Sequence, residues 1–407
     1  MTGRLSLRVL TRDGRLLFLT RCTRLFAYGA LSVVLVFYLT SLGLTASQTG
    51  ILLTLTLVGD TVVSLYLTTQ ADRIGRRRML IVGALLMAAA GLAFAYTRNF
   101  VFLVVAGTIG VISPSGNEVG PFLPIEQAAL SHVVPGQART TVFAWYTLVG
   151  SFATAAGALS GGALSHVLQQ RALPAVESYR VVVLLYAVLG VALALLFTRL
   201  SPAAEVSESG PGSFGIGRSR AVVLRLSGLF ALDSFAGGFV VQSFAAYWFY
   251  LRFGVNPATL GAIFFWANVL AGISALLATR LAARFGLVRT MVFTHLPSNI
   301  LLILVPLMPN LPLATLVLLA RFSISQMDVP TRQSYVMAVV KPEERSAAGG
   351  VTGVARTIGA ALAPVFAGFL YARPSLMSVP FFVAGTLKII YDLLLYRGFA
   401  AVQPPDV

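Results

Sequence analysis

Apolar runs about as long as a bilayer is thick recur along the whole chain. Five of them are almost free of charge: residues 25–42, 79–97, 181–198, 257–279 and 377–396. A helix rises 1.5 Å per residue, so roughly 20 apolar residues cross the hydrocarbon layer. The runs show no alternation of period two, which argues against an outer-membrane barrel. They predict an all-α polytopic membrane protein.

The composition excludes an ordinary soluble protein. Hydrophobic residues make up 57% of the 407 residues and charged residues only 11%, and the mean hydropathy is +0.84. Soluble domains carry about 25% charged residues, which this chain lacks. The basic N-terminus leads directly into a full-length span, which predicts a retained helix rather than a cleaved signal peptide.

Turn signals divide the apolar sequence into twelve predicted membrane spans. A Ser-, Gly- and Pro-rich stretch at 201–220 predicts a flexible cytoplasmic linker, with an N-terminal six-helix bundle at 1–200 and a C-terminal one at 221–407. The spans are expected at 15–41, 48–70, 79–97, 100–131, 138–166, 177–199, 221–251, 257–279, 290–308, 311–339, 346–371 and 377–397.

The basic residues are distributed unevenly between the two sides of the membrane. With a cytoplasmic N-terminus, most Lys and Arg residues outside the spans fall on cytoplasmic segments. The net charge of +16 is therefore interpreted as a topology signal, not as a nucleic-acid surface. We expect a multi-pass protein of the plasma (inner) membrane with both termini cytoplasmic. The outer loops carry only Arg98, Arg171, Arg180, Arg252 and Arg373.

The two halves of the sequence repeat each other. "PIEQAALSHVVPGQAR" from Pro124 matches "PTRQSYVMAVVKPEER" from Pro330 at a constant offset, and "ADRIGRRRM" matches "AARFGLVRTM", which pairs Gly75 with Gly286. Two parallel six-span repeats joined by a linker are typical of transporters, whose binding site lies between the repeats near the midplane of the membrane.

The segment between the second and third spans carries a specific motif. Asp72, Arg73, Gly75, Arg76 and Arg77 follow the pattern G-x-x-x-D-R-x-G-R-R, with Thr68 in place of the first glycine. In this the chain resembles the major facilitator superfamily. The resemblance implies two six-helix bundles, a secondary transporter that works by alternating access, and a central cavity lined by spans 1, 4, 7 and 10.

The resemblance also implies a cytoplasmic latch. In the family, an acid at the end of the fourth span accepts the second arginine of the motif; here these are Glu126 and Arg76. Asp72 is expected against the start of the eleventh span, where a helix N-terminus favours a carboxylate. The gating residues are therefore predicted to be Asp72, Arg73, Gly75, Arg76 and Glu126.

Glycines in the fifth span have two readings. "GALSGG" at 157–162 is similar to the Gly-Pro-x-x-Gly-Gly element of the family's proton antiporters but lacks its proline. The same small residues also let two helices approach closely in any membrane bundle. The glycines concerned are Gly150, Gly157, Gly161 and Gly162.

Six basic and six acidic residues fall inside the predicted spans. A charge at the bilayer centre costs about 2.5–3.5 kcal/mol unless it is paired or hydrated. Two pairs at i, i+4 are predicted as static ion pairs: Asp328 with Arg332, and Lys388 with Asp392. Glu118 and Asp233 have no cation one turn away, so they are the first proton-coupling candidates, followed by Asp60 and Asp328.

Substrate contacts are expected from polar and aromatic residues of the cavity-lining spans, although Arg356 and Phe239 are equally consistent with helix packing. The candidates are Arg24, Tyr28, Asn117, Arg321, Gln326, Arg332, Arg356 and Phe239.

These features predict proton-coupled efflux of a small organic molecule by antiport. The alternative is proton- or ion-coupled symport of an anionic metabolite, because Arg21 and Arg24 stand in the first span without an acid. We expect a monomer without catalytic residues, cofactor or nucleic-acid partner. A metal site is not expected, since the single cysteine, Cys22, and the three histidines are scattered. No phosphate-binding loop is present, and His132, His166 and His295 lack a partner motif, which argues against an enzyme.

Overall fold

The computed structural model describes residues 10–118, 120–134, 139–205, 219–341 and 344–399. Within these ranges the described residues form helices, turns and loops, and none forms a strand. The chain divides into two compact units. Unit 1 comprises 1–44, 55–210 and 255–265, and unit 2 comprises 45–54, 211–254 and 266–407.

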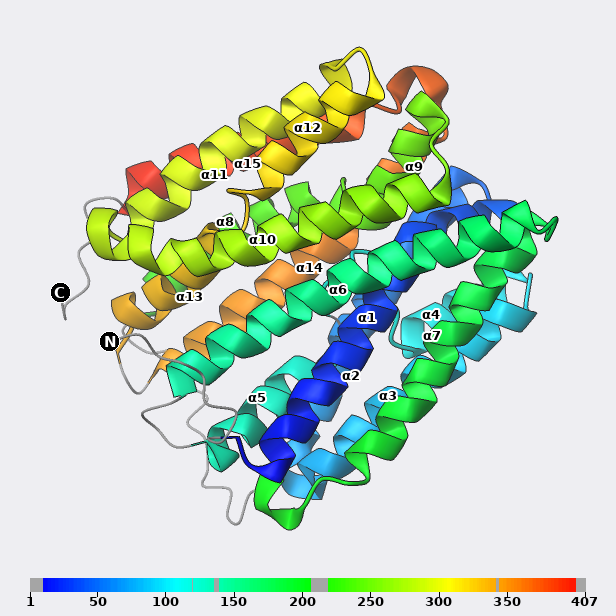
Figure 1. Cartoon of the computed structure of the whole chain (residues 1–407). Helices are drawn as coiled ribbons and strands as arrows, with labels where there is room; N and C mark the ends of the chain where they lie inside the picture. Colours follow the sequence, from blue (N-terminus) through cyan, green and yellow to red (C-terminus); the bar gives the residue numbers. More distant parts are fainter. Residues whose placement is uncertain (1–9, 119, 135–138, 206–218, 342–343, 400–407) are drawn as a thin grey trace. The chain divides into compact units, whose positions relative to one another are not determined.

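Each unit is a bundle of helices (Figure 1). Unit 1 is built mainly from α1 (Arg12–Ser41), α2 (Ala46–Ile74), α3 (Arg76–Tyr96), α4 (Phe100–Ile109), α5 (Phe122–Val133), α6 (Arg139–Gln170) and α7 (Ala175–Phe197). Unit 2 is built mainly from α8 (Arg220–Gly238), α9 (Gln242–Phe253), α10 (Pro257–Phe285), α11 (Leu287–Leu304), α12 (Leu311–Phe322), α13 (Asp328–Val339), α14 (Arg345–Tyr371) and α15 (Val379–Phe399).

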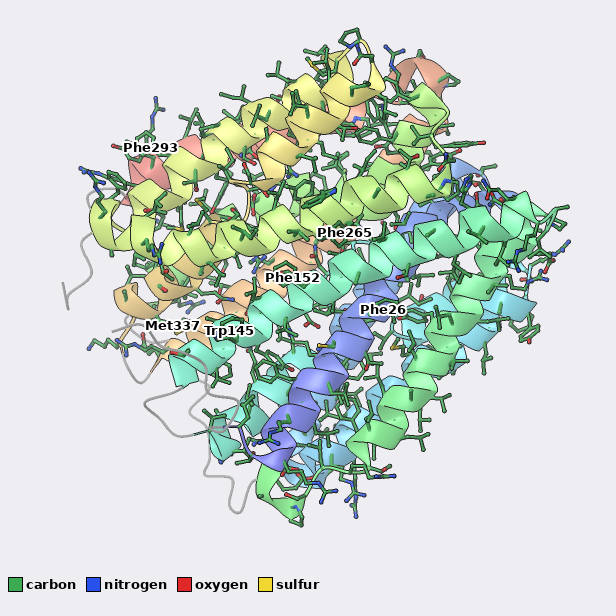
Figure 2. All side chains as sticks on the ribbon, in the orientation of Figure 1. Phe26, Trp145, Phe152, Phe265, Phe293 and Met337 are labelled. Carbon is green, nitrogen blue, oxygen red and sulfur yellow. The ribbon has the colours of Figure 1, made fainter. Side chains whose placement is uncertain are left out.

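The lengths and compositions of these helices fit membrane spans. Ten helical stretches of the described chain are long and apolar enough to cross a membrane, and α4 and α12 are shorter apolar helices. Large apolar side chains are exposed on the bundles, among them Trp145 and Phe152 on α6 and Phe293 on α11 (Figure 2). Such surfaces suit lipid rather than water. The predicted twelve-span helical fold is confirmed.

Three of the twelve spans are interrupted. The fourth consists of α4 and α5, with residues 110–118 and 120–121 of the described chain between them. The seventh is interrupted at 239–241 and the tenth at 323–327, and neither of these breaks was expected from the sequence. A break frees backbone groups that lipid cannot hydrogen-bond, so it has to be satisfied by protein.

Side chains of neighbouring helices satisfy the break in the fourth span. The Tyr186 hydroxyl on α7 donates to the Val111 carbonyl at 2.5 Å. The Asp60 carboxylate on α2 accepts from the Gly120 N–H at 2.7 Å. Side chains of α2 and α7 therefore hold the backbone of the break in place within unit 1.

The predicted repeat is visible in the backbone of the corresponding turns. Gly75 precedes α3 with φ +117°, and Gly286 precedes α11 with φ +85°. These left-handed conformations favour glycine because a Cβ clashes there. The same turn therefore joins α2 to α3 and α10 to α11, as the pairing of the two glycines predicts.

Small residues bring helices of unit 1 into close contact. Gly91 on α3 lies against Ala187 on α7, and Gly190 on α7 lies against Ala88 on α3. A Cβ added at Gly91 would lie 2.9 Å from the Ala187 Cβ and 3.0 Å from its Cα. Because glycine meets alanine at both points, a larger side chain at either glycine would push the backbones of α3 and α7 apart.

We predict that Gly91→Ala destabilises the protein although alanine is the better helix former. Overpacking of this kind costs about 1–3 kcal/mol, so the midpoint of thermal unfolding in nanodiscs should fall by several degrees. Gly228→Ala on α8 is the matched control, because a Cβ there meets nothing within 4 Å. An unfolding midpoint of Gly91→Ala at or above that of the wild type would contradict the prediction.

Candidate functional site

Two arginines and two glutamates form a buried cluster in unit 1, here called the Arg24 cluster. The Arg24 Nη2 lies 2.8 Å from Glu126 Oε2 and 3.1 Å from Glu118 Oε2. The Arg21 Nη1 lies 2.5 Å from Glu118 Oε1. The arginines come from α1, Glu126 comes from α5, and Glu118 comes from the break before α5. The two positive and two negative charges balance.

The two glutamates of the Arg24 cluster differ in their access to solvent. Glu126 is fully buried and also accepts hydrogen bonds from the hydroxyls of Thr20 and Tyr146. The Glu118 side chain is 19% exposed. Glu126 is therefore fixed by three donors, from Thr20, Arg24 and Tyr146, whereas Glu118 is the member that water or a solute can reach.

Asp60 is a buried carboxylate of a different kind. Its side chain is 4% exposed. Its Oδ1 accepts from the Gly120 N–H at 2.7 Å and from the Ser64 hydroxyl at 3.4 Å. Among the residues that the structure describes, none places a cation on it. Asp60 thus lies in unit 1 with hydrogen-bond donors but without a compensating charge.

The predicted latch residues have other contacts in the described structure. The Glu205 carboxylate accepts from the backbone N–H groups of Arg76 and Arg77 at 2.7 and 3.0 Å, so it caps the N-terminus of α3. Glu126 faces Arg24, which corrects the expectation that Arg76 is its partner. Arg73 is exposed, and the Asp72 side chain lies outside the described residues.

A second buried cluster, the Asp233 cluster, lies in unit 2. Lys388 Nζ on α15 lies 2.5 Å from Asp233 Oδ1 on α8. Arg332 Nη1 on α13 lies 3.0 Å from Asp233 Oδ2 and 3.3 Å from Asp328 Oδ2. The predicted Asp328–Arg332 pair is therefore present. Asp233, expected to lack a cation, receives two from other helices, which spacing along α8 cannot reveal.

The predicted Lys388–Asp392 pair is wrong. Lys388 reaches α8, while Asp392 turns to α11, where it is hydrogen-bonded to His295 and accepts from the Asn299 amide, each at 2.8 Å. Neither partner was predicted from the sequence, in which His295 has no partner motif. Their i, i+4 spacing on one helix face was the available signal.

Two cationic candidates of unit 2 lie outside these ion pairs. Arg321 on α12 and Arg356 on α14 are half-buried, and the Nε of each is buried without a hydrogen bond. No carboxylate among the described residues lies within ion-pair distance of either. Gln326 lies in the break after α12, where its N–H contacts the Ser274 hydroxyl at 3.3 Å.

The remaining candidates divide into packed and accessible residues. Tyr28 is fully buried and stacks on Tyr186 with ring centroids 6.2 Å apart. Phe239 is buried and packs against Phe235 and Phe366. Asn117 is exposed within the break of the fourth span. The aromatic pair thus contributes to the cores of the units, and Asn117 is free to contact solvent.

Three glycines of α6, at 150, 157 and 161, pack against α1, and Gly162 packs against α10. A Cβ at Gly150 would lie 2.6 Å from the Arg21 Nε, and one at Gly161 would lie 2.8 Å from the Ala30 Cα. A Cβ at Gly157 would meet the Ala30 nitrogen at 2.9 Å, and one at Gly162 would meet the Gly261 Cα at 2.9 Å. These contacts match the helix-packing reading of the stretch.

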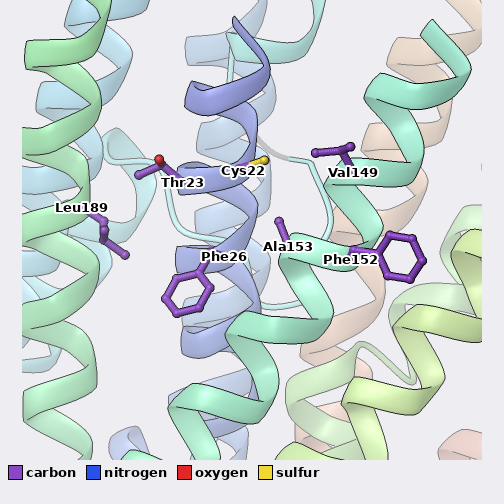
Figure 3. A pocket seen from close by; sticks show the side chains of 7 residues that line it. All are labelled: Cys22, Thr23, Phe26, Val149, Phe152, Ala153 and Leu189. Carbon is purple, nitrogen blue, oxygen red and sulfur yellow. The ribbon is translucent and has the colours of Figure 1, made fainter. Parts of the chain in front are cut away.

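An open apolar pocket of about 530 Å³ lies on unit 1 where α1 forms the floor between α6 and α7 (Figure 3). None of the predicted substrate residues lines it. The lining residues are Cys22, Thr23, Phe26, Val149, Phe152, Ala153 and Leu189.

Comparisons with known proteins agree with this architecture. The chain is 32% identical to the uncharacterized membrane protein YJR124C of Saccharomyces cerevisiae, over 97% of this chain and 95% of the yeast protein. It is 26% identical to the quinolone resistance protein NorA of Staphylococcus aureus over 34% of each chain.

The fold is similar to that of a solved bacterial homologue of the human lysosomal transporter Spinster, in an inward-facing and occupied conformation. The TM-score is 0.75 at 16% identity, covering 95% of this chain and 97% of that one. The sequence model of the Major Facilitator Superfamily matches residues 17–320 and 227–406. The chain therefore belongs to the Major Facilitator Superfamily and is a secondary transporter that works by alternating access, not an enzyme.

Proposed function

We propose that this transporter exports a small organic molecule in exchange for protons. The observation that carries the proposal is the setting of Asp60, buried with two hydrogen-bond donors and no cation. A buried charge without a partner is costly, and a bound proton removes that cost. When water reaches the carboxylate, the charged form is stabilised and the proton leaves. Asp60 is therefore the proposed proton carrier of unit 1.

The other acids of unit 1 are less suited to carry the proton. Glu118 and Glu126 share the charges of Arg21 and Arg24. A proton on either glutamate would leave a buried arginine without its counter-ion, which is costly in turn. Glu118 is nonetheless partly exposed, so it is the proposed contact through which a cationic substrate could compete for the cluster.

Outward direction is proposed from the similarity to NorA, which is named for quinolone resistance and matches 34% of this chain. We also propose the orientation that the basic loops indicate, with both termini on the cytoplasmic side of the plasma membrane, and a monomer of two six-helix halves.

Replacing Asp60 by asparagine separates its role as a hydrogen-bond acceptor from its proposed role as a proton carrier. Asp60→Asn keeps an Oδ1 acceptor for the Gly120 N–H but cannot bind a proton, so we expect gradient-driven flux to fall at least about tenfold while the fold is retained. The assay is transport of a fluorescent quinolone by proteoliposomes with and without an imposed pH gradient. Ser64→Ala is the matched control, since it removes one hydrogen bond and leaves the carboxylate.

Equal stimulation of wild type and Asp60→Asn by the pH gradient would contradict the assignment of the proton to Asp60. Flux of the wild type that ignores the gradient for a broad panel of organic compounds would contradict proton coupling itself. Accumulation of substrate inside intact cells, rather than its loss, would overturn the outward direction.

A second candidate function is symport of an organic anion. It is favoured by Arg321 and Arg356, two half-buried guanidinium groups with a free Nε each and no carboxylate partner in the described part of unit 2. Arginine binds carboxylates through paired N–H donors, so two such groups suit an anionic ligand.

The anion hypothesis predicts that Arg321→Gln and Arg356→Gln each weaken uptake of an organic anion at least about tenfold, because a charge-assisted hydrogen bond is lost. The readout is uptake of radiolabelled mono- and dicarboxylates by proteoliposomes. Arg373→Gln, at an exposed position after α14, is the control for loss of one positive charge. If both variants move quinolone and carboxylates like the wild type, the two arginines are structural.

A further inference from the structure

A histidine inside unit 2 has acidic groups on both sides of its ring. His295 on α11 is 4% exposed. Its Nδ1 lies 2.8 Å from Asp392 Oδ1 on α15, and its Nε2 lies 3.8 Å from Asp233 Oδ1 on α8. An imidazolium has an N–H at each nitrogen, so it donates to Asp392 from Nδ1 and places positive charge beside Asp233 at Nε2, whereas neutral imidazole has only one N–H and no charge.

The hydrogen bonds at Nδ1 are compatible with two protonation states. The Asn299 Nδ2, a donor, lies 3.2 Å from Nδ1, and Asp392 is an acceptor of the same nitrogen. Asn299 also donates to Asp392 Oδ2 at 2.8 Å. With a proton on Nδ1, the ring donates to Asp392. With the proton on Asp392, Nδ1 accepts. The hydrogen bond between His295 and Asp392 can therefore be made with one proton, which lies either on Nδ1 of His295 or on the Asp392 carboxylate.

The ion pairs around the ring leave Asp392 to His295. Lys388 and Arg332 are bound to Asp233 and Asp328, and Arg321 and Arg356 act on the same two carboxylates from farther away. Among the described residues no lysine or arginine lies within ion-pair distance of Asp392, so His295 is the basic group beside it. Since an unpaired buried charge is costly, a proton held between His295 and Asp392 is favourable at that position.

The groups facing the His295 ring come from three helices besides its own. They are Asp233 on α8, Arg332 on α13, and Lys388, Tyr391 and Asp392 on α15; the Tyr391 ring packs edge-on against the imidazole at 5.9 Å. Asn299 completes the set on α11. The charged residue of α12, Arg321, makes no contact with His295 in the described structure.

We propose that His295 and Asp392 together bind one exchangeable proton inside unit 2. This proton lies beside the Asp233–Lys388 ion pair, so its arrival and departure change the attraction that holds α8, α11 and α15 together. A role of this proton in transport rests on the proposed proton coupling. The binding of the proton to His295 and Asp392 does not depend on that proposal. The site is separate from Asp60, which belongs to unit 1.

Proton binding can be observed directly, because the protein has only three histidines. Protein labelled with ¹⁵N-histidine in nanodiscs, with no substrate, is followed by NMR between about pH 5 and pH 9. His295→Gln and His132→Gln assign the signals, and the exposed His132 is the internal reference. We expect both ring nitrogens of His295 to carry a proton at one end of this range and only one of them at the other end.

Asp392→Asn tests the role of the pair. The amide keeps the shape but removes the anion beside the ring, so the doubly protonated form of His295 should be less populated in this variant than in the wild type under the same conditions. Glu177→Gln, at a carboxylate in the first turn of α7, should leave it unchanged. A His295 signal that stays in one protonation state over the whole range, or that titrates identically in Asp392→Asn, would overturn the inference.

The NMR result for His295 can be told apart from a failure of the proposed proton-coupled export. If His295 titrates and the flux ignores the pH gradient, the proton site stands and proton-coupled export fails. If the flux follows the gradient and His295 keeps one state, export stands and this site fails.

Discussion

The cost of charge in an apolar interior governs this structure. Asp233, 5% exposed, lies 2.5 Å from Lys388 and 3.0 Å from Arg332. Lys388 without the carboxylate would be a buried, uncompensated charge, and so would the carboxylate without the two cations; Arg332 also pairs with Asp328. Because the three residues come from three helices, their pairing fixes α8, α13 and α15 against one another. Arg24 has the corresponding role in unit 1, where it joins α1 to Glu118 and Glu126.

The interrupted spans follow from the same constraint. Irregular backbone inside a membrane protein needs partners, and the break in the fourth span has them in Tyr186 and Asp60. It also places Glu118 where both arginines of α1 reach it. The tenth span is broken at the residues between Arg321 and Asp328. Breaks and charges thus occur together, which is the arrangement that a transporter requires for binding a polar solute.

The sequence was sufficient for the features that depend on local pattern. Span positions follow from hydropathy, the tight turns from Gly75 and Gly286, and the Asp328–Arg332 pair from its i, i+4 spacing. Pairing between helices was not predictable in this way. Lys388 and Asp392 have the same spacing, yet each faces a different helix, because α15 packs on both α8 and α11. His295 gained its partners only through that packing.

The two units differ in how their charges are balanced. In unit 1 the arginines and glutamates of the Arg24 cluster cancel, and Asp60 has no cation among the described residues. In unit 2 Arg321 and Arg356 have no carboxylate within ion-pair distance among the described residues, and the proposed exchangeable proton lies between His295 and Asp392. The proposed proton carrier, Asp60, belongs to unit 1 and the proposed anion contacts belong to unit 2, and the export proposal depends on the first.

The central claim is that partners on different helices hold these charges in the membrane interior, and a double-mutant cycle on Asp233 and Lys388 tests it most directly. Thermal unfolding in nanodiscs is compared for Asp233→Asn, Lys388→Met and the double variant. Asp233→Asn should cost about 3–5 kcal/mol because it leaves Lys388 buried and unpaired, and Lys388→Met should cost less because Asp233 keeps Arg332. The double variant should be more stable than the sum of the two predicts. Strictly additive losses would show that the two residues do not stabilise each other, and would contradict the account.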